Sequence, residues 1–376
     1  METTSYIDMM LNLGHTALSF IIILSIIVFI HEFGHYLAAR LCGVKIDAFS
    51  IGFGKELFGW TDRTGTRWKV SLAPLGGYVQ MHGDATEAST PDAEKLEDMP
   101  EEERKISFHY KALWQKAIIV AAGPFSNFLL AIVIFSCLIY TNGLSTTEPV
   151  IGEVLAGSAA EEAGLQPDDR ILEINGKEVG SFNDISSNIA TNLGEPIDIL
   201  LLRDGMQKNI ILTPRMDEFE DALGNKAQRP LIGISTKKIT SEDVGLFAAI
   251  GESVKRTYNM VEMSLAYLGQ IIIGDRSAKE LKGPLGIAEL SGKAASKDFS
   301  TIIWFMALLS VNLGFVNILP IPPLDGGHLL FYALEGAQGR PVAEKFQEWG
   351  YKVGFAFIAG LMLFTIYNDI VQLVVS

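Results

Sequence analysis

His31-Glu32-Phe33-Gly34-His35 closes an apolar run in which no Asp, Glu, Lys or Arg stands between Met9 and Ile30. In a helix, two histidines four residues apart lie on one face and can bind one zinc ion, and the glutamate between them can act as a general base. Ionisable groups at membrane depth are costly and mark functional sites. The alternative, a helix end whose histidines only cap or reach toward water, is therefore disfavoured.

The composition indicates a membrane protein with a water-soluble part. Of the 376 residues, 48% are hydrophobic and 20% are charged, and the mean hydropathy is +0.26. Uncharged windows long enough to cross a bilayer cover 9–30, 117–147 and 300–319, and a fourth at 353–376 contains only Asp369. The sequence predicts four transmembrane helices. The first lacks the basic flank of a signal peptide and carries the histidines, so we expect it to be retained.

The distribution of basic residues predicts the orientation. Lys and Arg follow the first span, precede the second and lie between the third and fourth, whereas 1–16, 117–147 and 353–376 contain none. Both termini and the segment from about 148 to 297 are therefore expected outside the cytoplasm. With Arg40 at the cytoplasmic interface, a rise of 1.5 Å per residue places His31 about 13 Å and His35 about 7 Å deep.

A third metal ligand is predicted at the end of the third span. The stretch Asn317–His328 contains three prolines and two glycines, so it cannot remain a regular helix. Broken backbone at membrane depth is tolerated only where it is buried in protein or lines a cavity. Asp325 would then reach the depth of His31 and His35 and complete a His₂-carboxylate zinc site, with Glu32 as the base. The alternative for Asp325 is a helix cap at the membrane boundary.

With the HEFGH motif and the segment 317–328, the chain resembles the site-2 protease family, of the bacterial regulator of sigma-E protease type. The resemblance extends over nearly the whole chain. The resemblance implies a zinc metalloprotease of the bacterial inner membrane that cleaves transmembrane segments of single-span proteins, such as anti-sigma factors or signal-peptide remnants. It assigns Zn²⁺ binding to His31, His35 and Asp325, the catalytic base to Glu32 and substrate binding to Asn317. Beyond HEFGH and 317–328, the likeness includes Leu75-Gly76-Gly77-Tyr78-Val79, Ala122-Gly123-Pro124-Phe125-Ser126-Asn127 and Gly283-Pro284-Leu285-Gly286-Ile287-Ala288.

Residues 149–213 resemble a single PDZ domain. Many relatives of this type have two PDZ domains in tandem. The pattern predicts a strand at 150–154, a short helix at 158–164, and a strand at 169–174 that ends in the hairpin turn Asn175-Gly176. A PDZ domain binds an extended chain end by adding a strand, and Val150, Ile151 and Gly152 match the binding loop. The alternative is a PDZ-like fold that acts only as a steric filter.

Two other segments are expected beside the membrane. Arg67–Leu72 alternates with period two after a turn at Asp62–Gly65, which predicts a β-hairpin, and the resemblance implies that it is membrane-associated. Its free edge could pair with an unwound substrate, or the hairpin could be a packed structural element. Residues 244–273 are apolar but carry four charges, which favours an amphipathic helix at the outer membrane surface over a fifth span.

The predicted fold class is a polytopic α-helical membrane protein with about four transmembrane helices, an inserted α+β PDZ domain and a membrane-associated β-hairpin. The expected parts are a first section of the protease core at 1–147, an extracytoplasmic PDZ domain at 148–215, a linker with amphipathic helices at 216–299, and the rest of the core at 300–376. The net charge of −14 is concentrated partly between Asp84 and Glu103, which predicts a solvated acidic loop and no nucleic-acid partner. Cys42 and Cys137 are not expected to form a disulfide.

The competing functions come from other classes. A non-catalytic membrane adaptor or sensor would use the PDZ domain to bind partners, and a transporter would use a polar site within the membrane. An adaptor would have no need for a base such as Glu32 between two metal ligands. The expected partners are single-span membrane protein substrates and the lipid bilayer, and the sequence does not indicate an oligomeric state.

Overall fold

The chain forms two compact units in the computed structural model, which describes residues 2–84, 99–192, 194–220, 226–237 and 239–375. The first unit, the membrane unit, combines Met1–Ile134 with Lys279–Ser376, and the second is Phe135–Ala278. Most of the expected acidic loop, residues 85–98, lies outside the described residues.

Four helices of the described chain are long and apolar enough to cross a membrane, as the sequence predicts. Twenty helical residues span about 30 Å, which matches the hydrocarbon core of a bilayer. Large apolar side chains such as Leu18, Phe125 and Leu363 are exposed on these helices, as expected for surfaces in lipid. The four helices are α1 (Glu2–Leu41), α4 (Leu113–Asn142), α9 (Phe299–Ile318) and α11 (Glu344–Val375).

The predicted hairpin is formed by β1 (Ile46–Thr61) and β2 (Arg67–Met81). Its turn is fixed by the Asp62 carboxylate, which accepts hydrogen bonds from the backbone N–H groups of Thr64 (2.8 Å) and Thr66 (3.0 Å) and from Trp68 Nε1 (2.9 Å). Burial acts to raise the pKa of Asp62, but these hydrogen bonds outweigh it and lower the pKa to about 2. The turn therefore keeps its anchoring charge at all but strongly acidic pH.

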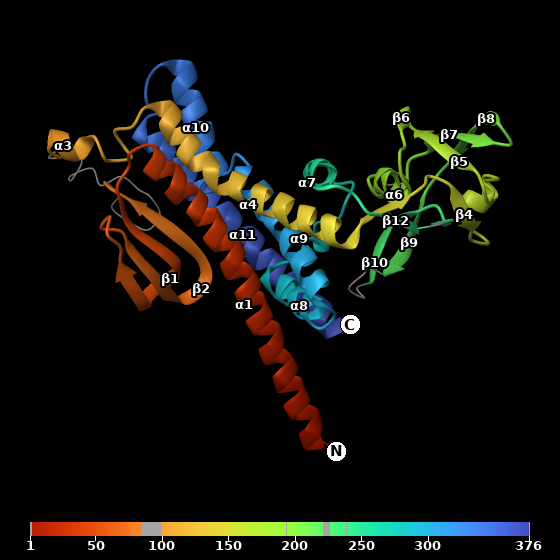
Figure 1. Ribbon diagram of the computed structural model, residues 1–376, viewed down its shortest axis with the longest axis horizontal. Helices are drawn as coiled ribbons and strands as arrows, with labels where there is room; N and C mark the ends of the chain where they lie inside the picture. The colour runs from red at the N-terminus through yellow and green to blue at the C-terminus, as the bar shows by residue number, and fades with distance from the viewer. Residues whose placement is uncertain (1, 85–98, 193, 221–225, 238, 376) are drawn as a thin grey trace. The chain divides into compact units, whose positions relative to one another are not determined.

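The hairpin packs on the helices at one part and exposes apolar side chains at another. Phe49 and Val79 join Ala39 of α1 and Ile119 of α4 in a buried cluster, which fixes the strands beside α1 (Figure 1). Leu57, Phe58 and Leu72 are exposed farther along the strands. This exposed apolar surface is compatible with the expected membrane association.

The second unit contains a small α+β domain around a buried aliphatic core. Its four-stranded antiparallel sheet has the order β6-β5-β7-β8, and the predicted Asn175-Gly176 turn joins β5 to β6 with positive φ at both residues. The predicted strand, helix and hairpin are confirmed. The elements are β4 (Ile151–Val154), α5 (Ala159–Glu162), β5 (Arg170–Ile174), β6 (Lys177–Glu178), α6 (Phe182–Ala190), β7 (Ile197–Arg203) and β8 (Met206–Leu212).

This domain extends beyond the expected end at residue 215. β11 (Ile234–Thr236) pairs with β4, and Ile232 is buried in the same core as the sheet. We therefore call residues 149–236 the PDZ-like insert. The remaining strands are β9 (Arg215–Glu220) with its partner β10 (Lys226–Leu231), and β3 (Leu144–Thr147) with its partner β12 (Ile239–Glu242).

The segment expected to be an amphipathic helix is α7 (Leu246–Ile273). Ala249, Ser253 and Thr257 form a buried stripe at a spacing of four residues, and Phe247 and Tyr258 are exposed. The helix does not qualify as a membrane span by length and composition. Its amphipathic character is thus confirmed, and its location at the outer membrane surface stays a prediction.

Asp369, the one charge in the fourth apolar window, caps a neighbouring helix. Its side chain accepts backbone hydrogen bonds from Gly283 (3.0 Å) and Gly286 (2.9 Å) at the start of α8 (Pro284–Ala295). A Cβ at either glycine would stand 2.7–2.9 Å from a carboxylate oxygen. The Gly-Pro-Leu-Gly sequence therefore allows the carboxylate to reach the N-terminus of α8, where a negative charge is favourable. Shorter helices complete the described part of the chain: α3 (Glu101–Arg104), the 3₁₀ helix Ala278–Glu280 and α10 (Asp325–Gln338).

We predict that Asp369→Ala destabilises the membrane unit by about 2–4 kcal/mol, because two buried N–H groups lose their acceptor. Thermal unfolding of the purified protein in detergent measures this change. Glu348→Ala, which removes an exposed ion pair with Lys352 on the same helix, is the control and should change the unfolding temperature little. Equal unfolding temperatures for Asp369→Ala and the control would refute the capping role.

Candidate metal centre

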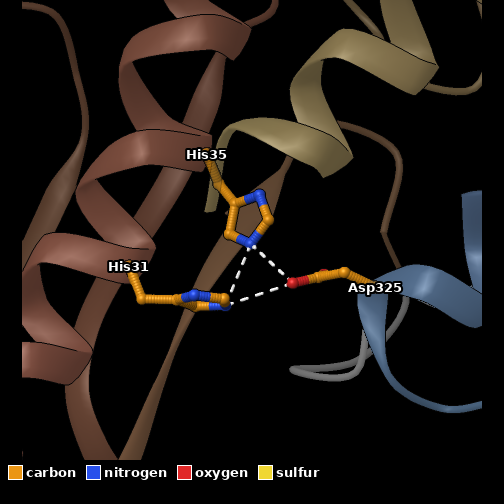
Figure 2. A group of neighbouring side chains, drawn as sticks. All are labelled: His31, His35 and Asp325. Atoms are coloured by element: carbon orange, nitrogen blue, oxygen red, sulfur yellow. Dashed lines mark hydrogen bonds and ion pairs between the residues drawn. The ribbon is translucent and has the colours of Figure 1, made fainter. Parts of the chain in front are cut away.

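Three side chains meet in the membrane unit at the positions that the sequence predicts for metal ligands. His31 and His35 project from one face of α1, and Asp325 is the first residue of α10 (Figure 2). Both histidines are 8% exposed. Nε2 of His31 and Nε2 of His35 lie 3.3 Å apart, and Oδ2 of Asp325 lies 3.2 Å and 3.5 Å from them.

These three atoms fit a single tetrahedral zinc ion. Bonds of 2.0–2.1 Å to nitrogen and oxygen, at tetrahedral angles, place neighbouring ligand atoms about 3.3 Å apart. The observed separations of 3.2–3.5 Å match that triangle. Oδ2 of Asp325 is buried and accepts no hydrogen bond from any described residue, so a cation would give this oxygen a partner. The donor set, two imidazoles and one carboxylate, is typical of catalytic zinc.

Asp325 reaches the histidines because the chain reverses sharply after α9. The loop from Leu319 to Leu324 folds back over the start of α10, so that a Cβ at Gly326 would stand 2.2 Å from the carbonyl oxygen of Leu319. A Cβ at Gly327 would likewise stand 2.5 Å from the nitrogen of Pro322. Two glycines after Asp325 are thus required by the loop itself. The prolines interrupt the helix, as the sequence predicts, and the glycines allow it to restart at the ligand.

A close contact between α1 and α4 orients His35. Its Nδ1 lies 2.9 Å from the carbonyl oxygen of Ile119, which must accept a hydrogen bond from Nδ1–H and leaves the Nε2 lone pair for a metal. Glycines make this approach possible. A Cβ at Gly34 would stand 2.4 Å from the carbonyl oxygen of Ala122, and one at Gly123 would stand 2.2 Å from Nε2 of His35.

Glu32, the expected base, lines a cavity of about 530 Å³ together with the three ligand residues. β2 contacts this residue, since a Cβ at Gly77 would stand 3.0 Å from Cγ of Glu32. The cavity therefore offers space beside the ligands, and one wall of that space is hairpin backbone. Polar side chains of α4, α10 and the segment before α4 continue the lining: His109, Lys116, His328 and Glu335.

Sequence reasoning missed two polar residues of this site. His328 lies one helical turn after Asp325, lines the cavity and has its Nδ1 3.1 Å from the hydroxyl of Tyr351. Asn127 is fully buried on α4 and lies 3.3 Å from His31. Both stand inside motifs that carry the family resemblance, 317–328 and 122–127. Their positions in those motifs are the signal that could have indicated a role.

The expected substrate-binding residues do not join this cluster. Asn317 is half-buried in the last turn of α9 and is not among the described residues that line the cavity. Ile151 lies inside the PDZ-like insert, fully buried, with its backbone N–H and C=O bonded to the segment 168–169. A Cβ at Gly152 would stand 2.6 Å from the backbone of β11. Val150–Gly152 thus form an occupied strand edge in place of the expected open binding loop, because β11 returns from 80 residues farther along.

This donor set, with a glutamate beside it in a cavity that the apolar helices α1, α4 and α11 help to line, defines a metallopeptidase of the membrane-embedded type. Comparison with known proteins supports the same class. The family model of peptidase family M50 matches residues 19–361, so the chain belongs to this family, the site-2 proteases. It is a membrane metalloprotease, and the family implies zinc as its metal.

Two relatives cover nearly the whole chain. A protein of Mesorhizobium japonicum, provisionally named a zinc metalloprotease, is 43% identical, with 94% of this chain and 98% of the relative aligned. The metalloprotease MmpA of Caulobacter vibrioides is 37% identical, with 94% of each chain aligned. Among solved structures, the PDZ domain of an SdrC-like protein from Listeria monocytogenes covers 25% of this chain and 90% of its own, with 19% identity and a TM-score of 0.20.

We predict that Gly123→Ala lowers the zinc affinity about tenfold or more, because the added methyl group occupies the position of the His35 ring. Zinc content of the purified protein after dialysis against a weak chelator measures the loss. Gly360→Ala is the matched control, since a Cβ there meets no atom within 4 Å. Full zinc retention in Gly123→Ala would show that the α1–α4 contact does not set the position of His35.

Proposed function

We propose that the protein is an intramembrane zinc endopeptidase that cleaves transmembrane segments of single-span membrane proteins, as in regulated intramembrane proteolysis. The observation that carries the proposal is the convergence of His31, His35, Asp325 and Glu32 on one cavity among apolar helices. A substrate that reaches this cavity has to be within the membrane or at its surface. Anti-sigma factors and signal-peptide remnants are candidate substrates of this kind.

The chemistry follows from the roles of the residues. His31, His35 and Asp325 hold the zinc ion, which when bound supplies a Lewis acid and lowers the pKa of water. Glu32 accepts a proton from the attacking water and returns it to the leaving amine. The alternative of a non-catalytic adaptor has less support, because Glu32 is intact and borders the space beside the ligands.

Substrate binding is proposed to involve the hairpin. A helical peptide keeps its amide bonds shielded, so a substrate has to be extended before its carbonyl groups can be attacked. β2 passes Glu32 at Gly77, and β1 and β2 form a sheet of two strands in the described chain. An extended substrate could add to this sheet as a further strand, and Asn317 could hold the chain near the end of α9. The packed face of the hairpin supports a structural role as well.

We propose that the protein lies in a bacterial inner membrane with its catalytic residues in the cytoplasmic half. The support is the asymmetric distribution of basic residues. Lys and Arg are absent from 1–16 and 353–376 and are enriched around 104–116 and 340–352. In this orientation both termini and the PDZ-like insert are extracytoplasmic. The insert then acts as a steric filter for substrates, because the edge of β4 that was expected to bind a chain end is occupied by β11.

Glu32→Gln tests the catalytic assignment. The variant should lose cleavage by about 10²–10⁴-fold yet keep its zinc, because glutamine is nearly isosteric, cannot accept the proton and replaces a residue outside the ligand set. Cleavage of a single-span substrate by the purified protein, together with metal analysis, measures both properties. His31→Ala should lose zinc as well as activity, and Glu348→Gln should change neither. Wild-type cleavage by Glu32→Gln would exclude this residue as the base.

Cysteine labelling tests the orientation. In a background without the two free cysteines, Cys42 and Cys137, one cysteine is placed at Asn183 in the insert or at Glu102 in α3, both exposed positions. A membrane-impermeant thiol reagent added to intact cells should label Asn183→Cys and should label Glu102→Cys only after lysis. The opposite pattern would reverse the orientation and move the zinc site to the other half of the bilayer.

A further inference from the structure

Asn127 is a buried polar residue whose hydrogen bonding is incomplete. Its side chain is fully buried on α4, and its Nδ2 stands 3.3 Å from Nδ1 of His31, on the side of the ring opposite to the ligand atom. Its Oδ1 has no hydrogen-bond partner among the described residues. The backbone oxygen of Asn127 accepts a hydrogen bond of 2.8 Å from the Ser310 hydroxyl, which holds this part of α4 against α9.

The role of His31 determines which atom of the amide should face it. Nε2 of His31 points at Asp325 and His35, at 3.2 and 3.3 Å, so Nε2 must carry the lone pair that binds zinc. A neutral imidazole then carries its hydrogen on Nδ1, which becomes a donor. An N–H donor on Asn127 cannot bond another donor. Exchanging the oxygen and nitrogen of the amide by a half-turn puts an acceptor at the same place, and the two arrangements have the same shape.

We propose that Asn127 is a positioning residue for the zinc site, with its Oδ1 accepting a hydrogen bond from Nδ1–H of His31. This bond fixes the tautomer and the ring plane of His31, as the carbonyl oxygen of Ile119 does for His35 at 2.9 Å. Both zinc-binding histidines of α1 are then oriented from α4, by a backbone carbonyl group at 119 and a side-chain amide at 127. The inference rests on the zinc site proposed above.

Zinc affinity distinguishes an acceptor from a space-filling side chain. The full-length protein and its Asn127→Asp, Asn127→Leu and Asn127→Ala variants are purified in detergent, and each competes for zinc with a chromogenic chelator. Aspartate offers only acceptor oxygens and should keep the affinity within about threefold of the wild type or tighten it. Leucine and alanine offer no acceptor and should weaken it about 10–100-fold, the usual effect of losing such a partner. Ser310→Ala, which leaves the side chain of Asn127 untouched, should bind zinc like the wild type.

The absorption spectrum of the cobalt-substituted protein supplies a second readout. The d–d bands should be unchanged in Asn127→Asp and shifted or weakened in Asn127→Leu, because the ring of His31 loses its fixed orientation. Wild-type affinity in a folded Asn127→Leu or Asn127→Ala variant would overturn the proposal. Loss of zinc from Asn127→Asp would also overturn the proposal, since the amide would then be required as a donor. This outcome counts only if the zinc-free variant resists proteolysis as the wild type does, which shows that it is folded. A wild-type protein that binds no zinc would instead refute the metal site itself.

Discussion

A buried carboxylate oxygen without a hydrogen bond, Oδ2 of Asp325, is the constraint on which the membrane unit depends. Burying an anion is costly unless a positive charge or several donors compensate for it. The described residues offer this oxygen only Nε2 of His31 and Nε2 of His35, at 3.2 and 3.5 Å. As zinc ligands, both imidazoles are neutral with the hydrogen on Nδ1, and neither can then donate from Nε2. A cation bound by all three atoms resolves the conflict, which is why the cluster is better explained by metal binding than by helix capping.

Close approach of backbones makes this convergence possible. Helices in lipid gain little from burying apolar side chains against one another, so small residues at their contacts determine how near they come. Gly34 and Gly123 bring α1 and α4 together at His35, and Gly326 lets the loop after α9 fold over the start of α10. Gly354 allows α11 to meet Pro322 of the same loop. The ligands are therefore positioned by glycines in four segments: α1, α4, the start of α10 and α11.

The features that the sequence predicted correctly are those with local signals. Uncharged windows gave the four apolar helices, period-two alternation gave the hairpin, and the spacing of His31 and His35 with the broken segment around Asp325 gave the three clustered residues. Contacts between distant segments had no such signal. The pairing of β4 with β11 could not be read from Val150–Gly152, because a strand edge looks the same whether or not a partner returns to cover it.

Hydrogen-bond satisfaction separates structural from functional polar groups in the apolar helices. Charge at membrane depth alone does not, since Asp369 and Asp325 are both acids located there or at the membrane boundary. Asp369 accepts bonds from two backbone N–H groups and so is explained by the fold that it caps. Asp325 keeps an oxygen without a hydrogen bond that the fold does not explain. Asn127 lies between these cases, because its backbone oxygen is bonded within the fold while its side-chain oxygen is not. The amide of Asn127 lies 3.3 Å from Nδ1 of His31, so a half-turn of the amide would give the oxygen that ring as its partner.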